Sequence, residues 1–438
     1  MRRALTLWHR FVGLFIAVFL VISGLTGAVI SWDHELDDWL NPHLTEARTE
    51  GPSKSALDIA RELETRDPRI RVTSIPISIE PGESMSFGVS GRVDPATKKQ
   101  IELGFNQIFI DPASGEELGR REWGAAWPIT RETFVSFLYQ LHYTLHIPEV
   151  WGIHEWGLWL MGVVALAWTI DCFVGFYLTL PVRHAPNPSR ANVVQRQLGR
   201  GFFARWKPAW LIKTGGSAYR INFDIHRAFG LWTWALLFIL AFTGFSLNLY
   251  REVFYPVMSM VSKVTPSPFD VRTPRDHDDP IEPKMGYAEI INRAAEEATS
   301  RGWAAPLGGV FYSPDFGVYS VGFYEPGDDH GSAGVGPPFL FFDGLDGRLL
   351  GDRQPWKGTA ADIFVQAQFP LHSGRILGIP GRILISLMGL VVAALSITGV
   401  VIWYRKRSAR VKQRRRREAE LAPSLDGAIA APRMDAAE

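Results

Sequence analysis

Cysteine is nearly absent from this chain, whose 438 residues include only Cys172. A single thiol cannot form a disulfide framework, a structural zinc site or a thiolate-ligated iron–sulfur cluster within one chain. A run of phosphate-binding glycines after a strand is also missing, because the glycine-rich stretch 331–336 leads into Pro337-Pro338 and therefore indicates a loop. These absences exclude cysteine-based centres and argue against a nucleotide-binding fold.

Long hydrophobic runs, in contrast, are present. Hydrophobic residues make up 47% of the chain and concentrate in four stretches, 12–31, 157–180, 229–249 and 383–403. Each stretch is long enough to cross the roughly 30 Å hydrocarbon core of a bilayer. The first is too long for a signal peptide and recurs as the third, so we predict that it is a retained membrane anchor.

The distribution of basic residues predicts the orientation of these spans, because Lys and Arg favour the cytoplasmic side. Basic residues gather before the first stretch, between the second and third, and after the fourth, at 405–407 and 414–417. Both termini are therefore expected in the cytoplasm, and the two long, acid-rich connections should form outward-facing domains. We interpret the last basic cluster as a topology determinant, and we expect no nucleic-acid binding.

The chain reads as two copies of one module. His9-Arg10-x-x-Gly13-Leu14 recurs as His226-Arg227-x-x-Gly230-Leu231, and Thr26-Gly27 recurs at the same separation as Thr243-Gly244. Each copy comprises a span that begins with His-Arg, an outward domain, a Leu-His segment and a second span.

The two long connections resemble each other as well. The stretch Asp111-Pro-Ala-Ser-Gly115 matches Asp343-Gly-Leu-Asp-Gly347, and Leu141-His142 corresponds to Leu371-His372. An Asp-x-x-x-Gly turn between alternating apolar residues is typical of a β-hairpin, and a helical pattern precedes each hairpin. We therefore predict that each connection folds as a small α+β domain with one helix against an antiparallel sheet.

The predicted fold class is a membrane α-helical protein with four transmembrane helices in two repeated modules and two outward α+β domains. The predicted segments are a first span (1–31), a first outward domain (32–140), a histidine segment with the second span (141–181), a basic cytoplasmic loop (182–221), a third span (222–250), a second outward domain (251–370), a histidine segment with the fourth span (371–404) and a basic, disordered cytoplasmic tail (405–438).

The repeated histidines predict b-type haem. An imidazole at the membrane edge of a helix can bind haem iron, and an adjacent guanidinium can pair with a haem propionate. By symmetry, His9 and His226 would bind an inner haem, with Arg10 and Arg227 beside them.

A second pair, His142 and His372, would bind an outer haem. His146 follows His142 by four residues, on the same face if this segment is helical, so it stays an alternative ligand. Two neutral imidazoles on one iron suit electron transfer. The histidines without a repeat partner are expected to be solvated surface residues: His34, His43, His277 and His330.

Two further polar residues have open roles. His154, beside Glu155, is a weaker candidate for a metal ligand. Asp171 is the one acid well inside an apolar stretch, and either proton compensation during electron transfer or a structural hydrogen bond would explain it.

The assembled pattern resembles the PepSY-associated transmembrane helix family over nearly the whole chain. The resemblance rests on the His-Arg-x-x-Gly-Leu copies, on the Asp-x-x-x-Gly hairpins, and on the runs 141–146, 168–181 and 371–378, which are similar to the iron-uptake branch of the family. It implies a bacterial inner-membrane protein with two periplasmic PepSY-like domains. Relatives of that branch include a ferrisiderophore reductase that carries haem between its spans.

The resemblance and the histidine pairs together favour a di-haem oxidoreductase that reduces a ferric siderophore on the periplasmic side. Its electron donor would be a separate reductase or a quinol, since no flavin domain is visible in the sequence. Two alternatives stay open: a non-enzymatic peptidase inhibitor or regulator, and a siderophore permease component. An inert anchor has no reason to repeat histidines at both membrane faces, and a permease would show broken, polar spans.

Overall fold

The computed structural model describes residues 1–182 and 201–421. It divides into two compact units. The helical unit comprises Met1–Ala17, Val174–Thr233 and Ala394–Glu438, and the sheet unit comprises Val18–Phe173 and Trp234–Ala393. Residues 183–200 of the predicted basic loop, with His184, and the last part of the predicted tail, 422–438, lie outside the described residues.

Three described helices are long and apolar enough to cross a membrane: α1 (Arg2–Ile30), α6 (Trp156–Thr179) and α16 (Gly378–Leu421). A fourth candidate is the pair α9 (Ala218–Trp232) and α10 (Trp234–Asn248), which is interrupted at Thr233. The sequence predicted one continuous span here. Thr233 has non-helical backbone angles (φ −106°, ψ 8°), although its N–H still donates to the Phe229 carbonyl at 3.0 Å.

The prediction of a disordered tail from residue 405 is wrong for its first part. Helix α16 continues to Leu421, well beyond the apolar stretch that ends near residue 403. This extension is rich in Arg and Lys, which are good helix formers even where no packing supports them.

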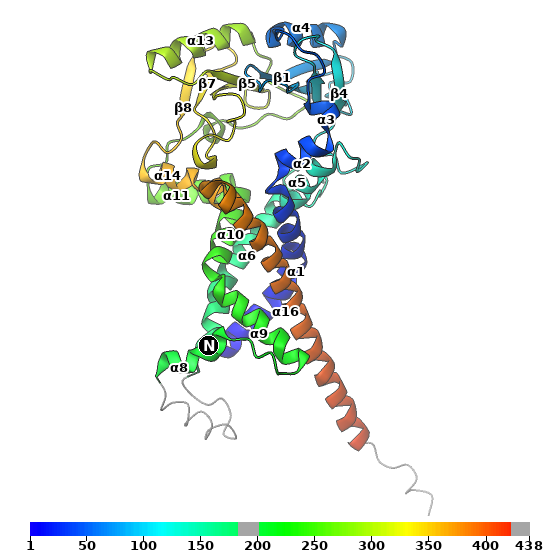
Figure 1. The fold of residues 1–438 in the computed structure, drawn as a ribbon, viewed down its shortest axis with the longest axis vertical. Coiled ribbons are helices and arrows are strands. Elements are labelled where there is room, and N and C mark those ends of the chain that lie inside the picture. Colours follow the sequence, from blue (N-terminus) through cyan, green and yellow to red (C-terminus); the bar gives the residue numbers. More distant parts are fainter. Residues whose placement is uncertain (183–200, 422–438) are drawn as a thin grey trace, which may run out of the picture. The chain divides into compact units, whose positions relative to one another are not determined.

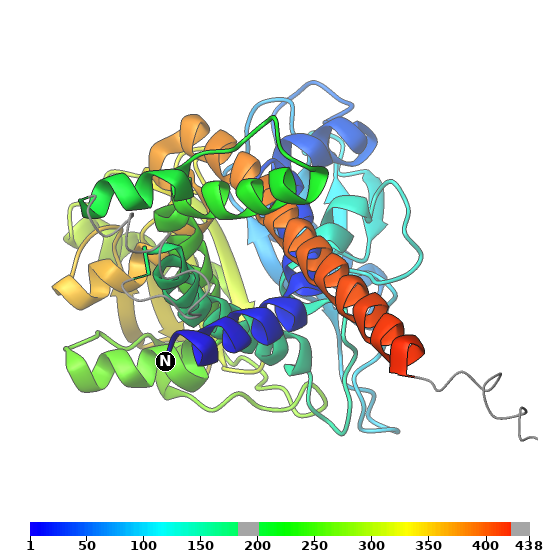
Figure 2. The same cartoon turned by 90° about the horizontal axis from the view of Figure 1, so that it is seen from below.

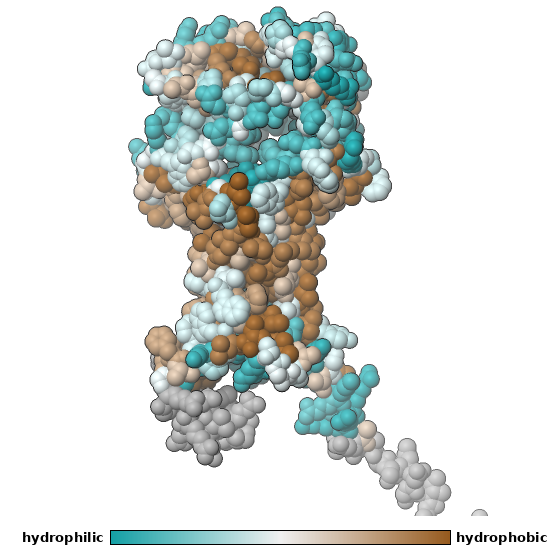
Figure 3. Space-filling view, viewed as in Figure 1, coloured by the Kyte–Doolittle hydropathy of each residue, from teal (hydrophilic) through white to brown (hydrophobic). Residues whose placement is uncertain are grey.

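Exposed apolar side chains gather on the spanning helices. In the sheet unit they include Val163, Ile170 and Phe173 on α6 and Leu387 and Leu390 on α16. Figure 3 shows hydrophobic surface over the helices of this unit and hydrophilic surface over its strands. Such an apolar face suits contact with lipid, because the backbone N–H and C=O groups of a helix are hydrogen-bonded to one another within the helix.

Shorter helices connect these elements. In the helical unit they are α8 (Phe202–Trp206) and the 3-10 helix η2 (Lys207–Trp210). In the sheet unit they are α2 (Asp33–Leu40), α3 (Pro42–Thr45), α4 (Ala56–Arg66), α5 (Phe134–Thr144), η3 (Tyr250–Phe254), α11 (Tyr255–Val261), α12 (Pro268–Val271), α13 (Tyr287–Ser300), η4 (Ser332–Gly334), α14 (Ala360–Gln366), α15 (Gln368–Ser373) and η5 (Arg375–Leu377).

The sheet unit contains one eight-stranded antiparallel sheet in the order β4-β3-β2-β1-β5-β6-β7-β8 (Figure 1). Its strands are β1 (Ile70–Pro76), β2 (Met85–Gly91), β3 (Gln107–Ile110), β4 (Glu117–Arg121), β5 (Leu307–Ser313), β6 (Val318–Phe323), β7 (Phe339–Asp343) and β8 (Leu349–Arg353). Both long connections therefore contribute a meander of four strands.

The two meanders are joined through β1 and β5, with Ser74 opposite Phe311 and Ile75 opposite Val310. The sequence predicted two separate α+β domains, whereas the structure has one sheet. Pairing the two edge strands satisfies backbone groups that separate domains would expose.

Helices α4 and α13 cover one face of the sheet (Figure 1). Alternating residues of β2 are buried, as expected for a strand with one covered face. A single core continues from α4 across the strands to α13, and its most buried members include Phe87, Val321, Ile290 and Leu340. The helix and the hairpin predicted in each connection are therefore present, but they share this core.

The Asp-x-x-x-Gly turns are stabilised by their aspartates. The buried Asp111 carboxylate accepts the backbone N–H groups of Arg48 at 2.7 Å and Ser114 at 2.9 Å, and it also bonds the Thr49 hydroxyl. Burial alone would raise the pKa of Asp111, but the hydrogen bonds from Ser114, Thr49 and Arg48 lower it below its usual value. The ionised carboxylate is therefore the form that the fold prefers.

Replacing this aspartate should destabilise the sheet unit. We expect Asp111→Asn to lower the free energy of unfolding by about 2 kcal/mol at pH 7, because the bonds lose their charged acceptor. The folded-state pKa lies below the value of about 3.9 in an unfolded chain, so the contribution is present above about pH 4 and is lost as the pH falls further. Thermal unfolding of the purified protein measures it. Asp94→Asn, in a turn where the carboxylate accepts one N–H from Ala96, should have a much smaller effect.

Candidate functional site

Two predicted histidines meet in the sheet unit. His142 lies on α5 and His372 on α15, both outside the spanning helices, and their ring centroids are 6.0 Å apart with an interplanar angle of 64°. Both line a cavity of about 560 Å³ together with residues of α1, α6, α10 and α16. This volume is within the range of about 300–1,000 Å³ that is common for ligand sites.

A threonine hydroxyl binds the Nδ1 atom of each ring. Thr26 Oγ1 lies 3.1 Å from His142 Nδ1, and Thr243 Oγ1 lies 2.9 Å from His372 Nδ1. Each hydroxyl already donates its one proton to a carbonyl of its own helix, that of Ile22 for Thr26 and that of Ile239 for Thr243. The hydroxyls must therefore accept from Nδ1–H, which leaves the Nε2 lone pair free to bind a metal ion.

The glycine after Thr26 makes room for the ring of His142. A Cβ atom on Gly27 would lie 2.9 Å from His142 Cε1, which is too short for a real contact, so a side chain at Gly27 would displace the imidazole. A Cβ atom on Gly244 would lie 3.5 Å from His372 Cε1, an ordinary van der Waals contact. The threonine contact is therefore shared by both halves, whereas the steric need for glycine is specific to the first.

Burial keeps both imidazoles of this pair neutral. Removal from water lowers the pKa of His142 to about 4, although a hydrogen bond to the Ser23 carbonyl opposes the shift. Removal from water, with a smaller contribution from neighbouring His142, lowers the pKa of His372 to about 3. Neutral imidazole is the form that binds iron.

The same cavity has a polar end. Asp33, His34, His330 and Arg375 line it there, and Arg375 Nη2 lies 3.2 Å from Asp33 Oδ1. Arg375 was not among the predicted site residues, although it stands three residues after His372 in the run 371–378. Its guanidinium could pair with an anionic group of a ligand in this cavity.

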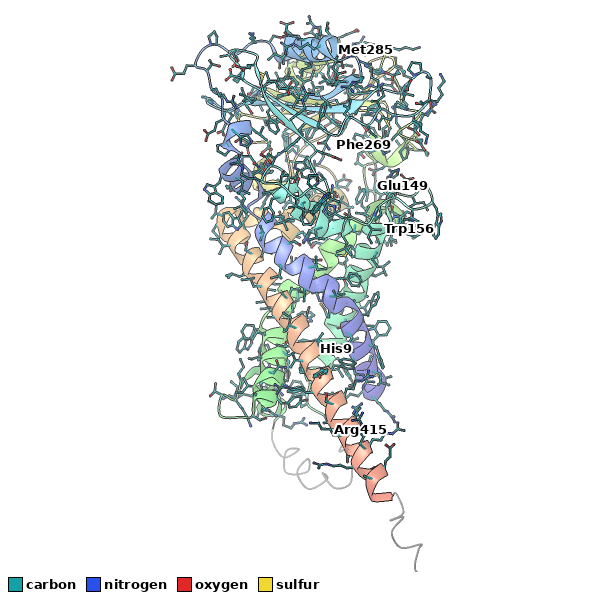
Figure 4. All side chains as sticks on the ribbon, turned by 90° about the vertical axis from the view of Figure 1, so that its right-hand side faces the viewer. His9, Glu149, Trp156, Phe269, Met285 and Arg415 are labelled. Carbon is teal, nitrogen blue, oxygen red and sulfur yellow. The ribbon has the colours of Figure 1, made fainter. Side chains whose placement is uncertain are left out.

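The other predicted pair meets in the helical unit. His9 on α1 and His226 on α9 have ring centroids 6.2 Å apart at an interplanar angle of 57°. Figure 2 shows this unit from below, and His9 is labelled in Figure 4. A Cβ atom would lie 3.5 Å from His9 Cε1 at Gly175 and 3.2 Å from His226 Cε1 at Gly399.

His226 repeats the hydrogen-bonding pattern of the first pair. Its Nδ1 lies 3.0 Å from the Leu395 carbonyl and 3.0 Å from Thr398 Oγ1. The Thr398 hydroxyl donates to the Ala394 carbonyl at 2.8 Å, so Nδ1 again carries the proton and Nε2 is free.

The two arginines beside this pair have different surroundings. The Arg10 Nε atom is buried and has no hydrogen-bond partner among the described residues. Arg227 instead bonds Asp224 at 2.7 Å and the carbonyls of Pro208 and Ala209. Of the two arginines predicted to pair with a propionate, Arg10 retains an unpaired buried donor, whereas Arg227 is engaged in structural contacts.

His146 does not join either pair. Its Nε2 lies 2.9 Å from the Phe137 carbonyl, and its ring stacks on Phe137 with centroids 4.6 Å apart. His146 is absent from the residues that line the cavity, whereas His142 is among them. Of the two alternatives in this segment, the geometry favours His142.

The remaining histidines of the sheet unit lie near carboxylates. His154 Nε2 lies 3.3 Å from Glu149, and its ring is 5.3 Å from that of His277. His43 lies 3.4 Å from Glu132. His34 and His330, which the sequence suggested are unrelated surface residues, have ring centroids 4.6 Å apart. No repeat signal could have found this last pair, because the two residues do not correspond.

Comparison with known proteins identifies the family. The family model described as the PepSY-associated TM region matches residues 6–406, which is most of the chain. The chain belongs to this family. A search among curated proteins finds no match. The predicted family is thereby confirmed, and its membrane character agrees with the several apolar helices of the structure.

The protonation of the buried pair can be tested directly. In this PepSY-associated TM family member, purified without a cofactor, we expect His142 and His372 to stay neutral at pH 5.5, because burial lowers both pKa values. Nitrogen-15 NMR of labelled histidine should show the proton on Nδ1. His277, whose pKa is raised by its hydrogen bond to Asp315, is the internal control and should titrate above 6.5. Titration of His142 near 6.5 would contradict the assignment.

Proposed function

We propose that this protein binds two b-type haems and conducts electrons across the membrane to a ferric chelate. The observation that carries the proposal is the occurrence of two imidazole pairs at nearly the same separation, 6.0 Å and 6.2 Å. Imidazoles that bind one metal from opposite sides, with metal–nitrogen bonds of about 2 Å, have ring centres about 6 Å apart. Both pairs fit this requirement.

Haem bound at such sites would supply reversible one-electron chemistry. The residues of this chain would position it and exclude water. Thr26 and Thr243 orient two of the ligands, and the apolar walls of the cavity disfavour solvent. Hydrogen bonds to Nδ1 also raise the basicity of the imidazole ligand. The buried Nε of Arg10 is available to a propionate at the other pair.

The direction of transfer follows from the proposed topology. The basic flanks of the spans support cytoplasmic termini in a bacterial inner membrane, with the sheet in the periplasm. Electrons would enter from a quinol or a separate reductase near the His9–His226 pair. A ferric siderophore or another ferric chelate would accept them on the sheet side, where reduction weakens binding of iron by hard oxygen ligands.

The alternative functions leave the main features of the sites without a role. A peptidase inhibitor or regulator has no need for neutral imidazoles with free Nε2 atoms inside helical packing. A permease would show broken, polar spans. The pair α9–α10 is broken at Thr233, but the described cavity is lined mainly by apolar side chains and gives no polar path.

The haem content of variants tests the proposal. Purified protein should show a reduced-minus-oxidised b-type spectrum with about two haems per chain. Replacing His142 or His372 by Ala should remove one haem, because each iron needs both imidazoles, and the His226→Ala variant should lose the other. Pyridine haemochrome assays measure the stoichiometry.

His146→Ala is the matched control, because His146 lies four residues from His142 but bonds the Phe137 carbonyl. It should retain both haems. Absence of haem from protein expressed in haem-replete cells would refute the proposal, and equal haem loss in His142→Ala and His146→Ala would refute the assignment of the ligands.

A further inference from the structure

We propose that His34, Asp329 and His330 form a metal-binding site that receives the iron of the ferric substrate. His34 lies at the start of α2, and the other two precede η4, so the site joins the two long connections. One ligand atom of each residue lies within 4.8 Å of the others. Asp329 carboxylate oxygens are 3.9 Å from His34 Nε2 and 3.9 Å from His330 Nδ1.

A second carboxylate orients the first ligand. Asp33 Oδ1 lies 3.2 Å from His34 Nδ1, so it accepts that N–H and leaves Nε2 directed to Asp329. Metal-binding histidines commonly donate their other N–H to a carboxylate in this way, which fixes the tautomer and raises ligand basicity. The arrangement distinguishes His34 from a solvated surface histidine.

The electrostatic surroundings favour a cation. Asp33 and Asp329 place carboxylate oxygens 3.2 Å and 3.9 Å from the two ring nitrogens of His34. Arg375 is the cation close to the site, and it is paired with Asp33. With neutral imidazoles, Asp33, Asp329 and Arg375 sum to one net negative charge, which attracts a metal cation.

The donor set suits iron that enters and leaves. Two imidazoles and one carboxylate with open positions are typical of mononuclear Fe(II) sites, whereas structural zinc sites are closed by four protein ligands. His34 and Asp329 are about half exposed, with side-chain exposures of 53% and 52%. An iron ion could therefore keep ligands of its chelate while it binds here.

The position of the site connects it with the His142–His372 pair. His34 and His330 line the same cavity as those two histidines. The reduction of iron bound at this site rests on the proposed function. Each Fe(III) ion would take one electron, supplied by the quinol or reductase described above, and leave as Fe(II). No covalent bond to the protein forms or breaks.

Binding of Co(II) to the purified full-length protein tests the site without relying on electron transfer. Equilibrium dialysis at pH 8, where imidazoles are neutral, with metal quantified by mass spectrometry should give one Co(II) per chain. His330→Ala and Asp329→Asn should weaken binding at least tenfold, and Asp33→Asn should weaken it about tenfold through the orientation of His34. His43→Ala, which removes another histidine paired with a carboxylate, should bind normally.

The outcomes separate this site from the proposed function. Equal Co(II) affinity in wild type and His330→Ala, with both proteins folded by thermal unfolding, would overturn the site. A third outcome is protein from haem-replete cells that contains no haem but binds Co(II), with binding lost in the His330→Ala and Asp329→Asn variants. The Co(II) result would support the metal site, and the absence of haem would refute the proposed function.

The role of the site in reduction has its own test. Rapid mixing of dithionite-reduced protein with Fe(III)–nitrilotriacetate should oxidise wild type at least ten times faster than His330→Ala, with unchanged haem spectra. Equal rates would overturn the assignment of this site to the iron substrate.

Discussion

A hydrogen bond to Nδ1 of His142, His372 and His226 is the interaction on which the candidate sites depend. Thr26 and Thr243 accept from Nδ1 of His142 and His372, and the same contact recurs at His226. A buried ring without this bond would cost about 1–3 kcal/mol. Because each hydroxyl donates to its own helix, the bond also fixes which nitrogen carries the proton. Nε2 is then unprotonated, and its lone pair can bind a metal ion.

The shared sheet has a consequence for the site as well as for stability. Pairing of β1 with β5 joins both long connections in one core. His34 belongs to the first connection and His330 to the second, and their rings meet at 4.6 Å. Two separate domains, as the sequence suggested, would not fix these residues against each other. The His34–Asp329–His330 cluster therefore depends on the fusion of the two meanders.

The sequence was informative where it is periodic or repeated. Apolar runs predicted the spans, and the repeat predicted which histidines meet, because corresponding residues in two copies occupy corresponding places. It was uninformative where contacts are specific to one copy. Edge pairing of β1 with β5 follows no sequence period, and Arg227 is engaged by Asp224, which lies three residues before it but carries no motif. The break at Thr233 falls inside the apolar stretch 229–249, where no Gly or Pro of the sequence adjoins the threonine.

The difference between the two halves gives the proposed electron transfer a direction. Imidazole pairs of similar geometry would pass electrons either way, so the direction must come from what adjoins each pair. In the sheet unit a cluster of two histidines and one carboxylate adjoins the cavity and would hold the iron of the ferric chelate close to the His142–His372 pair. Reduction weakens the binding of iron by the hard oxygen ligands of the chelate, so release of Fe(II) makes the step hard to reverse. The His34–Asp329–His330 cluster has no counterpart in the internal repeat. It therefore distinguishes the proposed accepting end from the end where electrons would enter.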